Sequence, residues 1–285
     1  MSRVICWFSC GAASAVATKL AIEQQQTRYP NHSIEVVRIY LKNEHPDSDR
    51  FTADCEKWFG VPIRVIQDTK YGADVDTVIT TTRYMSGARG ARCTKELKKA
   101  VRLSYQKPDD VHVFGMHLGE EDRLDGLLDD EPELLLWPVL VESGYDKRMC
   151  ISAIQEAGIE PPAMYQLGYN NNNCIGCVKA EGAGYWNKIR HDFPDVFARR
   201  AEQERMLGNA LVTLSIGTVR KRFPELPSRI EAAGREVRYK YAKDGTVLGL
   251  RCPLHFLPEN VGSKKSILVG NCGFFCEKSP TGVFK

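Results

Sequence analysis

The fold is decided at the start of the chain, by residues 4–20, VICWFSCGAASAVATKL. Five apolar residues (4–8) give way to the small residues of SCGAAS (9–14), and a helical pattern follows from residue 15. This order predicts a strand, a tight loop and a helix. Backbone N–H groups and the helix dipole favour an anion at such a loop, and small side chains let it approach closely. Taken alone, the loop is either a phosphate site or a compact turn in a core.

Strand and helix patterns alternate along the next hundred residues. Apolar runs predict further strands at 34–41, 62–66 and 111–115, and helical patterns lie at 14–26, 48–59 and 94–105. Such alternation is typical of an α/β fold, in which helices cover both faces of a parallel sheet. Ligands bind these sheets at the carboxyl ends of the strands. Here the strand ends are SCGAAS, the segment 42–45 with Asn43, and the segment that begins at Gly115.

The pattern changes after about residue 140. Helical segments are predicted at 147–158, 180–207 and 217–234, a four-asparagine loop at 170–173, and a hairpin around residues 243–245. We therefore expect an α/β domain over residues 1–140. A cysteine-rich region, mostly helical and irregular, is expected over residues 141–285 and packed on that domain.

Composition is ordinary for a globular chain of 285 residues, with 43% hydrophobic and 26% charged residues. No stretch approaches 18 consecutive apolar residues, and the first apolar run is too short for a secretory signal, so we expect a cytoplasmic protein without a membrane span. The net charge is +3, but residues 179–251 hold 15 Lys and Arg against 9 Asp and Glu. Solvated helix faces or a basic surface for a polyanion would explain this excess.

Ten cysteines in a chain without an export signal indicate metal or redox chemistry rather than disulfides. Cys174-x-x-Cys177 follows the asparagine loop, Cys93 precedes it with 80 residues between, and Cys272 and Cys276 form a second close pair. Zinc would take the two close pairs as a closed site. An iron–sulfur cluster would take Cys93, Cys174 and Cys177, with a fourth ligand from the C-terminal segment or an open iron. Of the two, we expect the cluster.

A charged segment, GMHLGEEDR, begins at Gly115. Its Glu120 could accept a hydrogen bond from a ribose hydroxyl or hold Mg²⁺. His117 and Arg123 could bind a phosphate or a sulfate. A solvated charged loop is the alternative interpretation of this segment.

Read together and in chain order, these segments resemble the phosphoadenosine phosphosulfate reductase-like family of the PP-loop superfamily, also called the adenine-nucleotide alpha-hydrolase-like superfamily. The resemblance covers roughly residues 3–180 and rests on SCGAAS, LKNEHPDSDRFTADCEKWFGVPI, ARCTKELK, GMHLGEEDR, LWPVLVESGYDKRMCISAIQEAGI and CIGC. It implies a Rossmann-like parallel sheet that binds ATP or another adenine nucleotide, with the phosphates on SCGAAS. It also implies a [4Fe-4S] cluster.

The resemblance and the spacing together give a set of expected site residues. Nucleotide binding is expected at Ser9, Cys10, Gly11, Ala12, Ala13, Ser14, Asn43, Gly115, His117 and Glu120, cluster binding at Cys93, Cys174, Cys177 and Cys276, and catalysis at Lys98, Arg123 and Cys272. Several positions depart from the family pattern. Thr94 replaces the second cysteine of a Cys-Cys pair, Ala13 replaces an aspartate of the loop, and His117 replaces an arginine. Asn271-Cys272-Gly273 only faintly resembles the Glu-Cys-Gly-x-His segment of the reductases.

Three functions are compatible with this pattern. The first is ATP-dependent sulfur transfer, through the cluster, to a nucleic acid or another acceptor, with a sulfur-donor protein as a partner. The second is sulfonucleotide reduction, in which the Cys272 thiolate attacks the sulfate sulfur and a thioredoxin-type protein resolves the product. The third is a non-catalytic protein that binds a nucleotide on the same fold. We expect the first.

Overall fold

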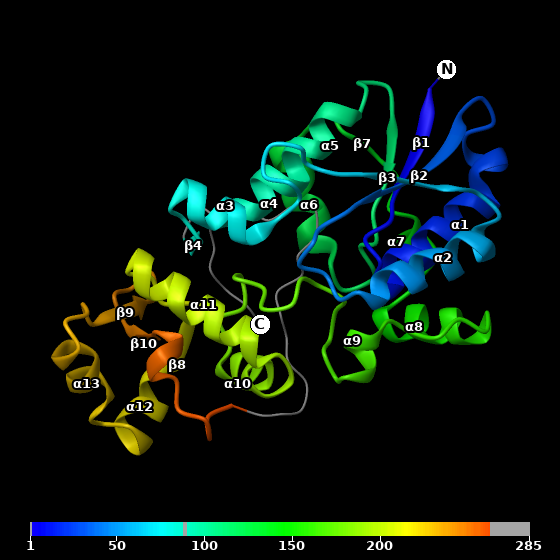
Figure 1. Ribbon diagram of the computed structural model, residues 1–285. Coiled ribbons are helices and arrows are strands. Elements are labelled where there is room, and N and C mark those ends of the chain that lie inside the picture. Colours follow the sequence, from blue (N-terminus) through cyan, green and yellow to red (C-terminus); the bar gives the residue numbers. More distant parts are fainter. Residues whose placement is uncertain (1, 88–89, 263–285) are drawn as a thin grey trace.

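The computed structural model describes residues 2–87 and 90–262, and a five-stranded parallel sheet forms its N-terminal part (Figure 1). The strand order is β3 (Ile63–Ile66), β2 (Ser33–Ile39), β1 (Arg3–Trp7), β6 (Val111–Val113) and β7 (Leu135–Leu136). Every neighbouring pair in this sheet is parallel. The α/β class with a Rossmann-like parallel sheet is therefore confirmed, and β1, the strand that the opening stretch predicts, lies at the centre of the sheet.

The pleat of β1 sends alternate side chains to the two faces of the sheet. Val4 and Cys6 pack in one core with α1 (Ala12–Arg28), α2 (Asp47–Phe59) and α8 (Lys147–Glu156). Ile5 and Trp7 face the other core, with α6 (Glu121–Asp130) and α5 (Ala100–Tyr105). Helices thus cover both faces of the sheet, and the carboxyl ends of its strands are not covered by these helices.

The helix predicted over residues 94–105 is present, but it is not regular. It consists of α4 (Arg92–Thr94), a π-helical turn η1 (Lys95–Lys99) and α5. Two elements before it lack a sequence prediction, namely α3 (Val75–Thr82) and the small hairpin of β4 (Ser86–Gly87) with β5 (Gly90–Ala91). A π turn widens the helix locally and is often found next to functional sites. Here it carries Lys98, one of the predicted catalytic residues.

The C-terminal part combines helices with a three-stranded antiparallel sheet of order β8-β10-β9. Its elements are α9 (Ala163–Gln166), α10 (Ala183–Asp192), α11 (Pro194–Leu207), β8 (Val212–Ser215), α12 (Ile216–Arg222), α13 (Leu226–Ala232), β9 (Arg238–Tyr241), β10 (Val247–Cys252) and the 3-10 turn η2 (Leu254–Phe256). The predicted hairpin is β9–β10. The helical segment predicted over 180–207 is two helices, because Pro194 begins a new one.

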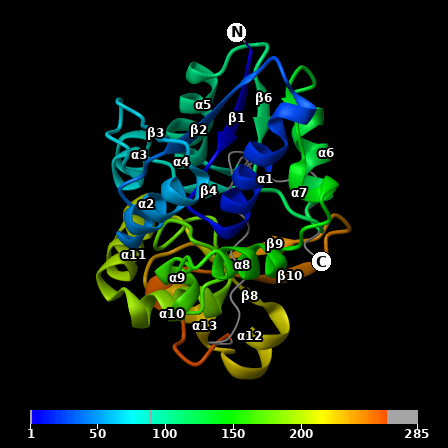
Figure 2. The ribbon, with the colours of Figure 1, turned by 90° about the vertical axis from the view of Figure 1, so that its right-hand side faces the viewer.

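Figures 1 and 2 both place this C-terminal part beyond the carboxyl ends of the strands. α7 (Val139–Glu142) and α8 lead the chain from the sheet towards it. The hydrophobic core of the C-terminal part also contains Val78 and Ile79 of α3 and Leu97 of η1. The two parts therefore share a core, and the division expected at residue 140 stays a prediction. Among the described residues, no helix is long and apolar enough to cross a membrane.

Candidate functional site

A pocket opens at the carboxyl ends of β1 and β6, beside the N-terminus of α1. It brings together most of the residues that the sequence predicts for nucleotide binding and two of the three predicted for catalysis. The predicted residues that line it are Ser9, Gly11, Ala13, Ser14, Gly115, His117, Glu120, Lys98 and Arg123. They come from three segments that are far apart in the chain and that the parallel sheet and its helices place side by side.

Ser14 organises the loop at the start of α1. Its hydroxyl accepts hydrogen bonds from the backbone N–H groups of Ser9, at 3.1 Å, and Gly11, at 3.3 Å, and it donates to the Gly11 carbonyl oxygen at 2.9 Å. The Ser9 hydroxyl lies 3.1 Å from it. Donor groups thus converge on one point at the positive end of a 17-residue helix. A phosphate oxygen bound there would take over hydrogen bonds that Ser14 now makes.

Cys10 contributes its backbone to this loop, and its side chain points away from the pocket. The thiol is buried, 3.3 Å from the Thr52 hydroxyl, and burial raises its pKa to about 12, so it remains protonated. Cys10 has a φ of 57°, a left-handed conformation that costs energy for a residue with a side chain. Ala12 is also buried, and its N–H donates to the Tyr165 hydroxyl at 3.3 Å.

Gly115 lies where the end of β6 meets the start of α1. A β-carbon at this position would be 2.5 Å from the Ser14 nitrogen and 2.6 Å from the Ser14 α-carbon. Such distances are shorter than real contacts, so any larger residue would push the helix away from the sheet. The glycine therefore serves the packing that holds the loop in place.

The charged segment after Gly115 forms an ion-pair network at the side of the pocket. The buried Glu120 carboxylate pairs with Arg123 and lies 3.4 Å from His117 Nε2, and it accepts the His117 backbone N–H at 3.2 Å. Lys147 Nζ donates to the Asn171 side-chain oxygen at 2.7 Å, and burial lowers the pKa of Lys147. The pocket therefore has positive charge on this side from Arg123 and Lys147, with Glu120 already paired with Arg123 of its own loop.

Several lining residues carry no sequence prediction. They are Trp7, Phe114, Met116, Lys147, Tyr165, Asn171, Asn172 and Asn173. Trp7 and Phe114 have nearly parallel rings with centroids 6.4 Å apart, and together with Met116 they supply an apolar wall. The position of Trp7 close to the end of the first apolar run (4–8) is the signal that could have placed it here, since ligands bind at strand ends in this class of fold.

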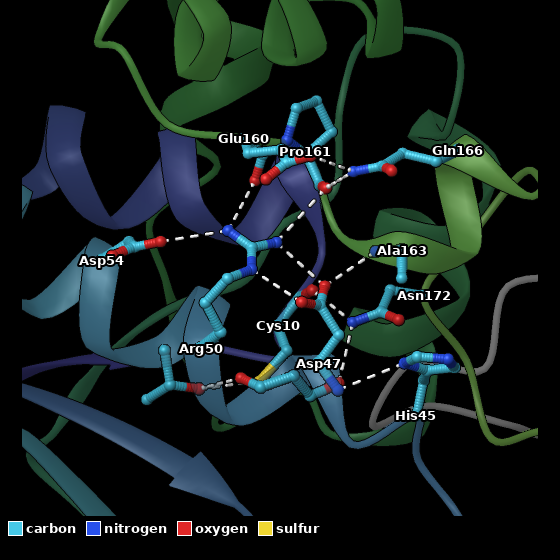
Figure 3. Close-up of polar contacts among 12 residues, drawn as sticks. Cys10, His45, Asp47, Arg50, Asp54, Glu160, Pro161, Ala163, Gln166 and Asn172 are labelled. Atoms are coloured by element: carbon cyan, nitrogen blue, oxygen red, sulfur yellow. Dashed lines mark hydrogen bonds and ion pairs between the residues drawn. The ribbon is translucent and has the colours of Figure 1, made fainter.

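The segment that leads to the asparagine loop is fixed to the start of α2, as Figure 3 shows. Arg50 donates to both oxygens of Asp47 and to the carbonyl oxygens of Glu160 and Pro161. Asp47 in turn accepts the Ala163 N–H at 2.8 Å. A bidentate arginine–carboxylate pair is well defined in direction. Residues 160–163, which precede α9 and the loop over residues 170–173, are therefore held against α2.

Cys93, Cys174 and Cys177, the predicted cluster ligands of the described residues, line one small cavity next to the pocket. Leu41, Val75 and Val178 also line it. In the described part of the chain, no group of three or more Cys, His, Asp or Glu side chains is arranged to hold a metal ion as it stands. The three thiols thus share a cavity without forming a closed ligand set. The predicted ligand Cys276 and the predicted nucleophile Cys272 lie outside the described residues.

The chemistry of this cavity fits a group with negatively charged thiolate ligands. Lys98 and Arg200 line it; Arg200 is ion-paired with Asp76, and the positive charge of Lys98 would stabilise thiolates. The buried Thr94 hydroxyl also lines it, and within the described residues its oxygen has no hydrogen-bond partner. A buried hydroxyl without a partner is costly, so a bound group that accepts from it would remove a penalty. Lys98 lines the neighbouring pocket as well, so the two sites share a wall.

The turn between Cys174 and Cys177 is shaped by Gly176. Its φ is 66°, and a β-carbon there would lie 2.6 Å from the Val196 side chain. Arg200 Nε donates to the Gly176 carbonyl oxygen at 3.1 Å. Asn43, predicted for nucleotide binding, lies beside this turn: its backbone oxygen accepts the Ile175 N–H at 2.8 Å, and its side-chain oxygen accepts the Val75 N–H at 2.8 Å.

Comparisons with known proteins identify no relative of this chain. No protein-family model matches the chain, and no curated protein matches it. The class that the fold and the pocket define is an α/β protein with a pocket at the carboxyl ends of a parallel sheet.

Proposed function

We propose that the protein is a phosphoadenosine phosphosulfate reductase-like PP-loop enzyme of the cytoplasm. It binds an adenine nucleotide and a [4Fe-4S] cluster and transfers sulfur, in an ATP-dependent reaction, to a nucleic acid or another acceptor. One observation carries the proposal: Lys98 lines both the strand-end pocket and the cysteine cavity. A nucleotide in the pocket and a group on the thiols would therefore be neighbours, as a reaction that uses both requires.

The pocket offers what a nucleotide needs. The donors around Ser14 and the start of α1 suit the phosphates, and Lys147 adds a positive charge near them. Trp7, Phe114 and Met116 supply the apolar surface that a purine base requires. Because Ala13 stands where the family that the chain resembles has an aspartate, the binding of ATP and its turnover are measured separately.

The cluster would be held by Cys93, Cys174 and Cys177, with Cys276 as the expected fourth ligand or with one iron open. When bound, it would supply a site at which sulfur is carried to the acceptor. The chain's own contribution is to keep the three thiols in one apolar cavity and to place Lys98 and Arg200 beside them. The eight cysteines of the described segments form no disulfides, in keeping with a reducing compartment.

The cluster proposal is tested by single substitutions in protein purified without oxygen. Wild-type protein should contain iron and acid-labile sulfide and should be brown. Cys93→Ser, Cys174→Ser and Cys177→Ser should each lose most of the iron. Cys150→Ser is the matched control, because Cys150 is a buried thiol of α8 in a different core, with its pKa raised to about 12 by burial. A colourless protein that contains zinc would contradict the cluster assignment.

The reaction is tested by offering the loaded protein ATP with RNA or DNA and a sulfide source. Formation of AMP and pyrophosphate that depends on the acceptor, with thiolated nucleosides found by mass spectrometry, is the expected result. Release of sulfite from adenosine phosphosulfate or its 3′-phosphorylated form, abolished by Cys272→Ser, would instead favour a sulfonucleotide reductase. Nucleotide binding without either reaction would leave a non-catalytic nucleotide-binding protein.

A further inference from the structure

A single short segment lines both sites. Asn171, Asn172 and Asn173 belong to the wall of the strand-end pocket, and Cys174 and Cys177 belong to the cysteine cavity. These residues follow one another in the chain, so a displacement of Asn173 also displaces the backbone of Cys174 next to it. The segment 171–177 is thus placed to respond to a ligand in the pocket and to alter the cavity.

Two contacts tie this segment to the phosphate loop. The Asn172 side-chain amide donates to the Cys10 carbonyl oxygen at 2.8 Å and to the Ser48 hydroxyl at 3.0 Å, and Asn172 is only 6% exposed. The Tyr165 hydroxyl accepts the N–H groups of Ala12 and of Asn172. Both contacts join the asparagine segment to the backbone of residues 10–12, where a bound phosphate would act.

We propose that Asn172 is a positioning residue that couples nucleotide binding to the burial of Cys174 and Cys177. The inference rests on the proposed nucleotide function of the pocket. A phosphate on the loop stabilises the left-handed backbone of Cys10 and so holds the carbonyl oxygen that Asn172 binds. The segment 171–177 then opens less often, and the two thiols reach solvent less often.

The coupling must work in both directions. If the nucleotide holds the segment closed, then a closed segment binds the nucleotide more tightly, because the coupling free energy between two sites is shared equally. Removing the Asn172 amide leaves the Cys10 carbonyl oxygen and the Ser48 hydroxyl without this buried donor. The loop and the segment would then move independently of each other.

The test uses the full-length, reduced and metal-free protein, in which the thiols can be alkylated. The rate of N-ethylmaleimide modification of Cys174 and Cys177 is followed by mass spectrometry of their peptide, with and without ATP. In the wild type, ATP should slow this modification about tenfold, within the range typical of coupled sites. Asn172→Ala should bring the ratio of the rate without ATP to the rate with ATP close to one. Asn170→Ala, an identical change in the same loop, should leave the ratio as in the wild type.

The ratio of the modification rates without and with ATP distinguishes a positioning role of Asn172 from a merely structural one. A structural defect raises the modification rate equally with and without ATP and leaves the ratio unchanged, and that result would overturn the inference. Tyr165→Phe, which removes the second contact, provides an independent variant if Asn172→Ala does not fold, and it too should lower the ratio. Calorimetry of ATP binding accompanies each measurement. If ATP binds to the wild type but does not slow the modification of the two thiols, this inference alone is overturned. If ATP does not bind to the wild type, the proposed function is overturned as well.

Discussion

His112 shows how one buried side chain connects the core to the pocket. It lies on β6, 1% exposed, and its Nδ1 accepts a hydrogen bond from the Trp7 indole N–H at 2.9 Å. Burial, together with the positive charge of Arg102, lowers the His112 pKa to about 4. The ring is therefore neutral at physiological pH. Trp7 lines the pocket, so the neutral form of His112 fixes part of the apolar wall.

We expect this histidine to make the protein sensitive to acid. Its folded-state pKa lies below the ordinary value of 6.5, so its contribution to stability is complete above pH 6.5 and is lost as the pH falls towards 4. Between pH 7 and pH 4, the wild-type free energy of unfolding should fall by up to about 3 kcal/mol more than that of His112→Asn. Urea denaturation followed by circular dichroism measures both, and parallel pH curves for the two proteins would contradict the assignment.

At the scale of elements, the contact between β6 and α1 determines where the phosphate loop lies. Gly115→Ala should move the start of α1, since its β-carbon has no room beside Ser14. The expected cost is about 1–3 kcal/mol in the free energy of unfolding, accompanied by weaker ATP binding. Urea denaturation and calorimetry give the two quantities.

Gly126→Ala is the control for this change. Gly126 lies within α6, and a β-carbon there would meet nothing within 4 Å. Alanine favours a helix over glycine, so this variant should keep ATP binding and be as stable as the wild type or slightly more so. Equal behaviour of the two variants would show that the contact at Gly115 is not what places the loop.

The elements that could be predicted from the sequence are those with a clear period. The strands β1, β2, β3 and β6 and the helices α1, α2 and α8 have such patterns, because each buries one face or lies wholly in a core. α3 lacks a prediction because its sequence, VDTVITTT, is rich in β-branched residues that favour strands, and packing overrides that preference. The π turn at residues 95–99 has no sequence signal that distinguishes it from a regular helix.

At the scale of the whole molecule, the sequence located the residues that strand ends and cysteine spacing can indicate. Four residues of SCGAAS follow a predicted strand, as do the charged residues after Gly115, and the parallel sheet brings them to one pocket: Ser9, Gly11, Ala13, Ser14, Gly115, His117, Glu120 and Arg123. The asparagines and Tyr165 could not be placed, because a polar loop gives no sign of which surface it will cover. Asn43 follows a predicted strand too, but it does not line the pocket. It makes hydrogen bonds to Ile175 of the cysteine turn and to Val75 at the start of α3.

The cysteine cavity also has a consequence for the order in which the protein is made. One of its thiols comes from residue 93 and the others from residues 174 and 177, so a ribosome must complete most of the sheet before the cavity can exist. The asparagines that line the pocket emerge just before the last two thiols. On the proposed function, a cluster could be bound only after residues 93–177, and with them the asparagines of the pocket wall, have been synthesised.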